Sequence, residues 1–467
     1  MLNVSDATME AYTKDGVHKT IRVFFPELNL TFSNSQIVKD SLSISESIYS
    51  GKSIEFVGCN SSTMNVKIYN ANYQLKGKRV EVYIRAGETE EIPVFKGIVD
   101  KATIQAERAF KEIEAYDILY TIGQKEIASW YNSISYPTTI GAIRRSLYSY
   151  VNLPYVDDNL PNDSIVIPEK QFENIESMQA LVAIKSICQI NGCFGIINRN
   201  GYFQHKFISG AYDMLIPGDD TYPGDDVFPS DADRDSGRYS FNLYKSIEYD
   251  EYYVKPVDRI QIRDEDDDPG IIYGAQTGNK YIIQGNMFAY GLPAGHRNQI
   301  AANIINIINK VSYHPSKISN MGMPFLECGD IVTYPITRKF GEQGNYDVDT
   351  FMILSRTLKG EQILTDSYTS EGEEEQSEFI TDIQNQLNAL KRAEPDMSNY
   401  YDMDQIDSMI DELPTMDEIE PFVMDEVATQ VNDLETPTGF NIVSCYALPS
   451  NPQANTLYCI QGMTIIL

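Results

Sequence analysis

The chain has 467 residues, of which 37 are basic and 67 acidic, so its formal net charge at pH 7 is −30. A surface this acidic repels phosphate and anionic lipid at long range, which argues against a protein that grips nucleic acid or a membrane surface. The length predicts about three domains with cores that fold without disulfide staples, and no apolar run approaches the ~18 residues of a membrane span.

Residues 1–120 are predicted to form a short helix followed by the first of two β modules. Ser5 or Asp6 can cap the helix, and Gly16 can end it. Beyond the helix, apolar residues alternate with a period of two in short runs separated by turn residues, which is typical of a compact antiparallel barrel or sandwich. The runs are 21–25, 42–44, 66–68, 80–84 and 92–94.

Residues 121–216 change to a helical period and indicate an α+β domain. Thr138 or Thr139 can cap one helix, and Asn191-Gly192 can end a second one. After the second helix, Asn200-Gly201 predicts a type I′ hairpin turn between strands at 194–198 and 202–207. The stripes at helical spacing are Ile140, Ile143, Leu147 and Tyr150 in the first helix, and Met178, Leu181, Lys185 and Cys188 in the second.

Residues 217–238 are predicted to be an exposed acidic connector built from a repeat. The hexamer Pro-Gly-Asp-Asp-Thr-Tyr is followed by Pro-Gly-Asp-Asp-Val-Phe, and this Pro and Gly content excludes a helix or a long strand. Asp231, Asp233 and Asp235 alternate on the same stretch, as carboxylates do in calcium loops. The glycine and the distal ligand are out of place for an EF-hand, so a solvated loop is the simpler interpretation of this weak metal candidate.

Residues 239–370 return to period-two alternation and predict a second β module that one helix interrupts. The helix is expected to end at His314-Pro315, because the residue before a proline is biased against helical geometry. The acidic run 264–270 is expected to be a solvated hairpin tip. The helical stripe consists of Ile300, Ile304, Ile307, Ile308 and Val311, and the clearest strands are 239–253, 257–263, 331–336, 351–357 and 362–368.

Residues 371–435 contain 20 acidic and two basic residues and are predicted to be an acidic helical stalk, followed by a small β tip at 436–467. Within the stalk, four apolar residues are spaced 3, 4, 3, which is the a/d seam of a coiled coil two heptads long. Because so short a helix is not stable alone, the seam predicts association with copies of the same chain. The seam residues are Ile380, Ile383, Leu387 and Leu390.

No motif in the sequence predicts catalysis or a bound cofactor. The four histidines stand in no metal-ligand spacing and are expected to be structural. There is no G-x-S-x-G elbow, glycine-rich phosphate loop or cysteine-nucleophile signature, although a Ser-His-Asp triad is defined by space and stays open. The six cysteines form no C-x-x-C and are expected to be reduced, buried thiols of a protein made in a reducing cytoplasm. No secretion signal is expected at the start of the chain.

Several stretches resemble bacteriophage tail-tip hub proteins, which are also called baseplate hubs or tail-associated hubs. The segments 40–51, 54–62 and 66–70 are similar to the opening of these proteins, and 183–207 is similar to their middle domain. The Pro-Gly-Asp-Asp repeat resembles Tyr-Pro-x-Asp-Asp repeats at the same place, and the segment 325–330 resembles a turn of their second tube domain. The likeness covers about residues 1–370, and its motifs are structural.

The resemblance implies a mainly β protein with two tube-forming, barrel-like β modules, a middle α+β domain, a short helical stalk and a small β tip. Each hub subunit of the family contributes two β tube domains, so a homotrimer presents six and continues a sixfold tail tube. The implied partners are the distal tail or baseplate ring protein, the tape measure protein and tail fibre or tip proteins. The implied place is the virion tail tip, assembled in the host cytoplasm, with DNA passing through without specific binding and no stable membrane insertion.

Many relatives carry a peptidase or another wall-degrading domain after the hub. This chain ends instead in the acidic stalk and the β tip, so we expect a structural protein and no enzyme. The alternatives are a tail-associated lysin with an unrecognised site, a receptor-binding tip protein, and a surface adhesin unconnected with a virus. The charge of −30 suits a conduit that must not grip DNA, and it equally suits a chain that only needs solubility.

Overall fold

The computed structural model separates the chain into two units, Met1–Glu394 and Pro395–Leu467, and each is described by itself. The connector at 217–238 and the stalk from 373 to 435 lie outside the described residues. The structure describes residues 2–14, 16–49, 58–69, 72–105, 109–172, 178–208, 214–215, 244–336, 347–360, 363–372, 441–445, 456–460 and 463–466.

The first β module begins with helix α1 (Asp6–Thr13). Ser5 caps this helix by accepting a hydrogen bond from the Thr8 amide at 3.3 Å, which confirms the predicted start. The helix ends at Thr13, three residues before the glycine that was expected to end it. The strands that follow are β1 (Lys19–Phe25), β2 (Leu30–Ser33), β3 (Ser43–Ser47), β4 (Thr63–Tyr69), β5 (Arg79–Ala86), β6 (Ile92–Gln105) and β7 (Phe110–Tyr116). Short 3-10 turns follow β1 (Pro26–Leu28) and β2 (Asn34–Gln36).

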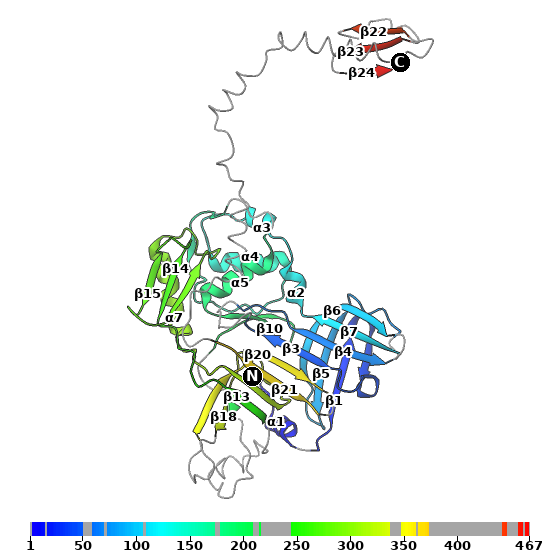
Figure 1. Cartoon of the computed structure of the whole chain (residues 1–467), viewed down its shortest axis with the longest axis vertical. Coiled ribbons are helices and arrows are strands. Elements are labelled where there is room, and N and C mark those ends of the chain that lie inside the picture. Colours follow the sequence, from blue (N-terminus) through cyan, green and yellow to red (C-terminus); the bar gives the residue numbers. More distant parts are fainter. Residues whose placement is uncertain are drawn as a thin grey trace. The chain divides into compact units, whose positions relative to one another are not determined.

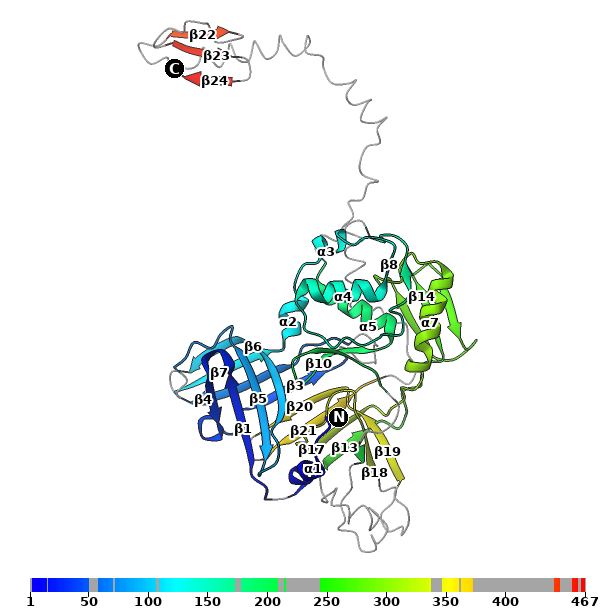
Figure 2. The ribbon, with the colours of Figure 1, turned by 180° about the vertical axis from the view of Figure 1, so that it is seen from behind.

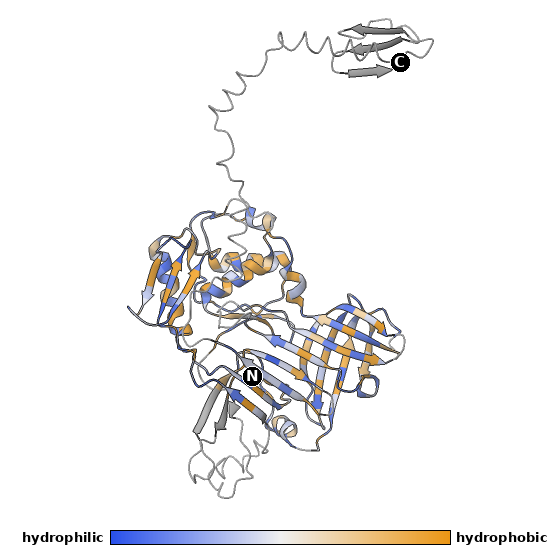
Figure 3. Cartoon of the chain, viewed as in Figure 1, coloured by the Kyte–Doolittle hydropathy of each residue, from blue (hydrophilic) through white to orange (hydrophobic). Residues whose placement is uncertain are grey.

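Six of these strands close into a barrel. Their order is β4-β7-β6-β5-β1-β2, and Ile37, just after β2, forms an antiparallel bridge with Ile68 of β4. Side chains at alternate positions are buried, as in β5, where Val82 and Ile84 are inaccessible to solvent. Figure 3 shows the resulting alternation of hydrophobic and hydrophilic residues along the strands. The period-two pattern predicted these strands correctly because one face of each strand packs into the barrel.

The two β modules share one sheet. Strand β3 pairs in antiparallel register with β20 (Ser355–Lys359) of the second module, so that Ser45 lies opposite Thr357. An antiparallel sheet of eleven strands results, in the order β13-β17-β21-β20-β3-β4-β7-β6-β5-β1-β2. Figures 1 and 2 show the early and late strands side by side. The other strands of the second module in this sheet are β13 (Tyr244–Tyr249), β17 (Ser316–Met321) and β21 (Thr365–Ser370).

A small sheet of three strands accompanies the second module. Strand β18 (Ile331–Ile336) pairs in parallel with β12 (Met214–Leu215) and antiparallel with β19 (Asp347–Met352). The small sheet packs against β13, because the ring of Phe351 on β19 meets the ring of Tyr249 edge-on with centroids 5.6 Å apart.

The middle segment contains four helices and two short strand pairs. Thr139 caps α4 by accepting a hydrogen bond from the Ala142 amide at 3.2 Å, and Gly192 ends α5 in the left-handed conformation at φ 63°. Both boundaries confirm the predicted signals. The elements are α2 (Ile118–Gly123), α3 (Ala128–Asn132), β8 (Thr138–Thr139), α4 (Ile140–Val151), β9 (Val166–Ile167), α5 (Ala180–Asn191), β10 (Phe194–Ile197) and β11 (Phe203–Lys206).

Three strands and one helix of the predicted second β module do not join the large sheet. They pack against the middle segment instead. Strand β14 (Arg259–Arg263) lies between β15 (Ile271–Gly274) and β16 (Lys280–Gln284). Helix α7 (Ala294–Ile308) contacts this sheet and α5. Beside it, Asn286 donates hydrogen bonds to the Ser186 carbonyl and to Gln189 Oε1 at 2.9 and 2.7 Å. Because α7 already ends at Ile308, the expected helix end at 314–315 is wrong.

The helical stripes were predicted only in part. Tyr150 is 45% exposed, and Val151 takes its place in the core. In α5 the stripe residues Leu181 and Lys185 lie on the more exposed side, whereas nearly all other positions are buried. The reason is tertiary, since α5 contacts α2, α4, α7 and β10 and therefore has no broad solvent face.

The loop between β10 and β11 differs from the predicted type I′ turn. Such a turn needs a positive φ at both Asn200 and Gly201, and of these two only Gly201 has one, at 84°. The Gly201 amide donates to the Asn198 carbonyl at 2.8 Å, so the chain turns over Arg199 and Asn200 and then passes through a left-handed glycine. This geometry leaves Arg199 at the tip of the loop, where it is 6% exposed.

The second unit contains a sheet of three strands, β22 (Asn441–Cys445), β23 (Thr456–Ile460) and β24 (Met463–Ile466). Strands β22 and β23 are parallel, and β23 and β24 are antiparallel. These strands agree with the β character expected of the last 32 residues. Among the residues that the structure describes, no helix is both long and apolar enough to cross a membrane.

Candidate functional site

Charged side chains from three parts of the chain meet in the interior where β3 pairs with β20. Strand β3 supplies one of them, the β10–β11 loop supplies another, and β20, β21 and the turn at 325–330 supply the rest. They combine three carboxylates with two guanidinium groups at distances of ion pairs. We call them the junction cluster: Glu46, Arg199, Glu327, Arg356 and Asp366.

Arg199 joins the middle segment to both β modules. Its guanidinium donates to both carboxylate oxygens of Glu46 on β3 and to the Val94 carbonyl on β6. The same group reaches the Leu326 carbonyl at 3.4 Å and lies 3.7 Å from the Glu327 carboxylate. Arginine suits this position because its planar fork offers five N–H donors in fixed directions.

Arg356 occupies the interior of the second module. Its guanidinium donates to both oxygens of Asp366 at 3.0 and 2.9 Å, to the Met323 carbonyl at 2.9 Å and to the Leu326 carbonyl. Asp366 also accepts hydrogen bonds from the Met323 amide at 2.8 Å and from the Tyr368 hydroxyl at 3.1 Å. Arg356 is 1% exposed and Asp366 is fully buried, so both charges depend on each other and on these polar partners.

The electrostatics of the junction cluster favour the charged form of the arginine. Burial alone would lower the pKa of Arg356, but the carboxylates of Asp366 and Glu46 raise it above its ordinary value. A guanidinium held this way stays charged over the whole range in which the protein is folded. Removal of one partner would leave a buried charge uncompensated, which typically costs about 3–5 kcal/mol.

A second buried ion pair holds the turn at 325–330. Lys206 Nζ on β11 donates to Asp330 Oδ1 at 2.7 Å, and the other oxygen of Asp330 accepts from the Glu327 amide at 2.7 Å. Burial would raise the pKa of Asp330, but Lys206 lowers it below its ordinary value. The middle segment therefore binds this turn through two side chains, Arg199 and Lys206.

The junction cluster was not predicted from the sequence, although one residue of β20 indicates it. Positions 354, 356 and 358 are Leu, Arg and Leu, so Arg356 stands on the inward face where the alternation expects an apolar residue. A charged residue at an inward position indicates a buried partner. The partners Glu46 and Asp366 come from β3 and β21, and nothing local in the sequence identifies them.

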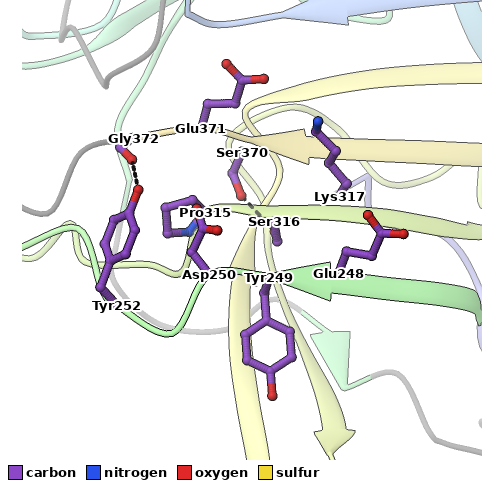
Figure 4. Close-up of a pocket in the computed structure, with 10 residues that line it drawn as sticks. All are labelled: Glu248, Tyr249, Asp250, Tyr252, Pro315, Ser316, Lys317, Ser370, Glu371 and Gly372. Atoms are coloured by element: carbon purple, nitrogen blue, oxygen red, sulfur yellow. Dashed lines mark hydrogen bonds between the residues drawn. The ribbon is translucent and has the colours of Figure 1, made fainter.

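A cavity of about 430 Å³ lies at the ends of β13, β17 and β21. Figure 4 shows that carboxylates, tyrosines and one lysine line it. The Tyr252 hydroxyl donates to the Gly372 carbonyl at 2.7 Å, and the hydroxyls of Ser316 and Ser370 lie 2.8 Å apart. The lining residues are Glu248, Tyr249, Asp250, Tyr252, Pro315, Ser316, Lys317, Ser370, Glu371 and Gly372.

Among the described residues that line this cavity, no catalytic triad or metal-ligand group is assembled. Its lining residues include no histidine or cysteine, and its serines bond to each other and not to a base. Glu248 and Lys317 stand opposite each other on the paired strands β13 and β17 (Figure 4). In the described part of the chain, no group of three or more His, Cys, Asp or Glu side chains is placed to hold a metal ion.

The site residues predicted from the sequence are not in the described part of the chain. The calcium candidates Asp231, Asp233 and Asp235 lie outside the described residues. The same holds for the coiled-coil seam at Ile380, Ile383, Leu387 and Leu390. Both therefore stay predictions.

The acidic run at 264–270 is more than a solvated hairpin tip. It does connect β14 and β15, as predicted, with Ile262 opposite Ile271. However, Asp264 and Asp268 approach the buried guanidinium of Arg297 on α7, at 2.5 and 3.4 Å. The run thus holds α7 against the sheet of β14, β15 and β16, which charge patterning alone did not indicate.

Two titratable groups with strongly shifted pKa values have structural explanations. Burial lowers the pKa of His205 to about 3, and its Nε2 lies 2.9 Å from the Tyr148 hydroxyl, so this histidine is neutral and structural. Burial raises the pKa of Asp117 to about 7, although the amides of Ser62 and Leu119 donate to its carboxylate at 2.6 and 2.9 Å. Asp117 caps α2 and links that helix to the start of β4.

Several solved structures are similar to this chain. No family model matches the chain, and no curated protein matches it. The chain is similar to the tail protein from Neisseria meningitidis MC58, with 11% identity, a TM-score of 0.43, and coverage of 76% of this chain and 97% of that chain. The corresponding values are 10%, 0.43, 76% and 98% for the 43 kDa tail protein of prophage MuSo2 from Shewanella oneidensis. They are 14%, 0.43, 80% and 99% for a prophage tail protein from Listeria monocytogenes EGD-e.

Proposed function

We propose that this chain is a structural hub of a phage tail tip or baseplate. The observation that carries the proposal is the single antiparallel sheet of eleven strands that runs through both β modules by way of the β3–β20 pair. A wall built from two modules per chain needs them in one fixed orientation, and a shared sheet supplies it. The junction cluster supports the same reading, since its buried charges tie both modules and the middle segment together.

The proposed assembly is a homotrimer. Three copies with two β modules each would place six similar units around one axis, which matches a sixfold tail ring. Within the described residues, β13 is an end strand of the large sheet and pairs only with β17. We propose that this edge pairs with a neighbouring copy, because the N–H and C=O groups of an edge strand favour pairing with another strand.

The acidic character supports a channel through which DNA passes without binding. The charge of −30 opposes contact with a polyanion, whereas a basic wall would hold phosphates. The proposed partners are the distal tail or baseplate ring protein, the tape measure protein, and tail fibre or tip proteins. The predicted stalk at 371–435 would carry the β tip as an attachment point, in a virion assembled in the host cytoplasm.

Imaging and mass measurement of the full chain test the proposal. We expect a particle of about 158 kDa, three times the chain mass of 52.8 kDa, with a threefold ring and a central hole. A map of assembled tails should place three copies at the tip, with first and second β modules alternating around the channel. Six copies, or an arrangement without that alternation, would overturn the model.

We also propose that the hub is not an enzyme. Purified protein incubated with host cell wall is expected to release no soluble peptide or sugar fragments above a buffer control. Sustained release that disappears on substitution of one acid or histidine would establish the lysin alternative instead.

A further inference from the structure

Three buried cysteines gather where the first β module meets the middle segment. The Sγ atoms of Cys59 and Cys188 are 3.5 Å apart, although the two residues are 129 positions apart in the sequence. Cys193 lies beside them, and its Sγ is 3.7 Å from the Cys188 carbonyl. All three side chains are at most 1% exposed.

The backbone holds the Cys59–Cys188 contact in place from both sides. Cys59 follows Gly58, whose carbonyl accepts a hydrogen bond from the Gly195 amide on β10 at 2.9 Å. A side chain at position 195 could not be accommodated, since a Cβ there would lie 2.5 Å from the Cys59 sulfur. Cys188 is fixed by the last turn of α5, which ends at Gly192. The two sulfurs therefore touch where the segment that leads into β4 meets the end of α5.

We propose that Cys59 and Cys188 are a latent disulfide, reduced when the protein folds and oxidised when the protein meets an oxidising medium. A disulfide bond is about 2.05 Å long, so the sulfurs need to approach by about 1.5 Å from their contact distance. The bond would join the first β module covalently to the middle segment. Cys193 is the competing partner of Cys188, because its thiol also interacts with the Cys188 thiol while its Sγ lies 3.7 Å from the Cys188 carbonyl.

The oxidant is a small-molecule disulfide such as oxidised glutathione. One cysteine thiolate attacks a glutathione sulfur, so that the glutathione S–S bond breaks, a mixed disulfide forms and one glutathione thiol leaves with a proton. The second cysteine, as thiolate, then attacks the mixed disulfide, and the second glutathione thiol leaves. In sum, two protein thiols lose two electrons and two protons, and one glutathione disulfide becomes two glutathione thiols.

Burial makes this oxidation slow and protects its product. Loss of solvent raises the pKa of the Cys59 thiol well above its ordinary value, so little attacking thiolate exists in the closed state. Oxidation therefore proceeds through local opening of the segment around Cys59, and dilute denaturant should accelerate it. Once the bond has formed and the segment has closed, a reductant meets the same barrier.

The test uses the reduced full chain, incubated with oxidised glutathione with and without about 1.5 M urea. After alkylation of free thiols, non-reducing digestion and mass spectrometry should identify a peptide that links Cys59 to Cys188, in wild type and in Cys193→Ala alike. We expect the linked peptide to form about tenfold faster in urea. The oxidised protein should unfold about 5 °C higher than the reduced protein, because the bond closes a long loop.

Two results would overturn the proposal. One is the absence of the Cys59–Cys188 peptide after incubation both with and without urea. The other is a Cys188–Cys193 peptide as the main product. The assignment comes from wild type and Cys193→Ala, so it does not depend on whether Cys59→Ala or Cys188→Ala folds. The proposed disulfide depends on the contact between Cys59 and Cys188 and is independent of the proposed hub function.

Discussion

Replacement of Arg356 by methionine is expected to be the most damaging single change in the junction cluster. Methionine has a similar length but no donors, so the variant loses the bonds to Asp366 and to the carbonyls of Met323 and Leu326. Asp366 keeps the donors on the Met323 amide and the Tyr368 hydroxyl, but it loses the guanidinium group with which it forms an ion pair.

The size of the effect follows from burial. Breaking a buried pair by removing one partner typically costs about 3–5 kcal/mol of unfolding free energy, because the remaining charge is desolvated. The matched control is Arg79→Met, the same chemical change at a side chain that is 72% exposed and 3.3 Å from Glu27. An exposed ion pair of this kind is worth about 0–1 kcal/mol. The two variants therefore differ by several kcal/mol, although each removes one arginine.

Urea unfolding of the full chain measures the difference with two probes. Far-UV circular dichroism follows the secondary structure of the whole chain, and the fluorescence of the single tryptophan, Trp130 in α3, follows the middle segment. We expect Arg356→Met to lower the dichroism midpoint by about 1 M, and Arg79→Met to leave it nearly unchanged. A shift of equal size in both variants would refute the reasoning.

A second variant separates the loss of the pair from a general disturbance of the core. Arg356→Met combined with Asp366→Asn removes both charges and keeps an oxygen that can accept from the Met323 amide. We expect this double variant to recover at least about half of the lost stability, because no unpaired charge remains buried. Strict additivity of the two single effects would contradict the assignment of the cost to an uncompensated carboxylate.

Three further predictions concern other parts of the chain. Burial keeps His205 neutral in the folded state with a pKa of about 3, against about 6.5 in the unfolded state, so the protein loses stability as pH falls below 6.5. At pH 4.5 the loss amounts to about 2.7 kcal/mol of unfolding free energy. His205→Gln should remove that share of the difference between the urea midpoints measured at pH 7 and pH 4.5. In Gly295→Ala the new Cβ in α7 meets no atom within 4 Å, so this variant should stabilise the protein by about 0.5–1 kcal/mol in thermal unfolding. In Gly141→Ala the new Cβ in α4 would lie 2.9 Å from Asp163, so this variant should destabilise the protein. Effects of the opposite sign would contradict both predictions. Leu387→Asp with Leu390→Asp should leave the proposed ring intact and make the region after residue 370 protease-sensitive, and a stalk as resistant as wild type would exclude a packed bundle.

Local patterns in the sequence determined much of the secondary structure. The alternation at Val82 and Ile84 predicted a barrel strand, Ser5 and Thr139 predicted helix starts, and Gly192 predicted a helix end. These features could be read because each depends on residues within a few positions of one another. A cap, a left-handed glycine and a one-sided strand leave their physical requirement in the residues themselves.

Only the tertiary structure decided how the pieces join. The β3–β20 pair brings Ser45 opposite Thr357, and the Cys59–Cys188 contact joins residues 129 positions apart. The residues of an edge strand do not indicate which strand it pairs with, because the backbone hydrogen bonds between strands are the same for every sequence. The exposure of Leu181 was likewise set by the elements that surround α5. A charged residue at an inward position, such as Arg356, indicates that it has a buried partner of opposite charge. Which carboxylate is that partner depends on the tertiary fold.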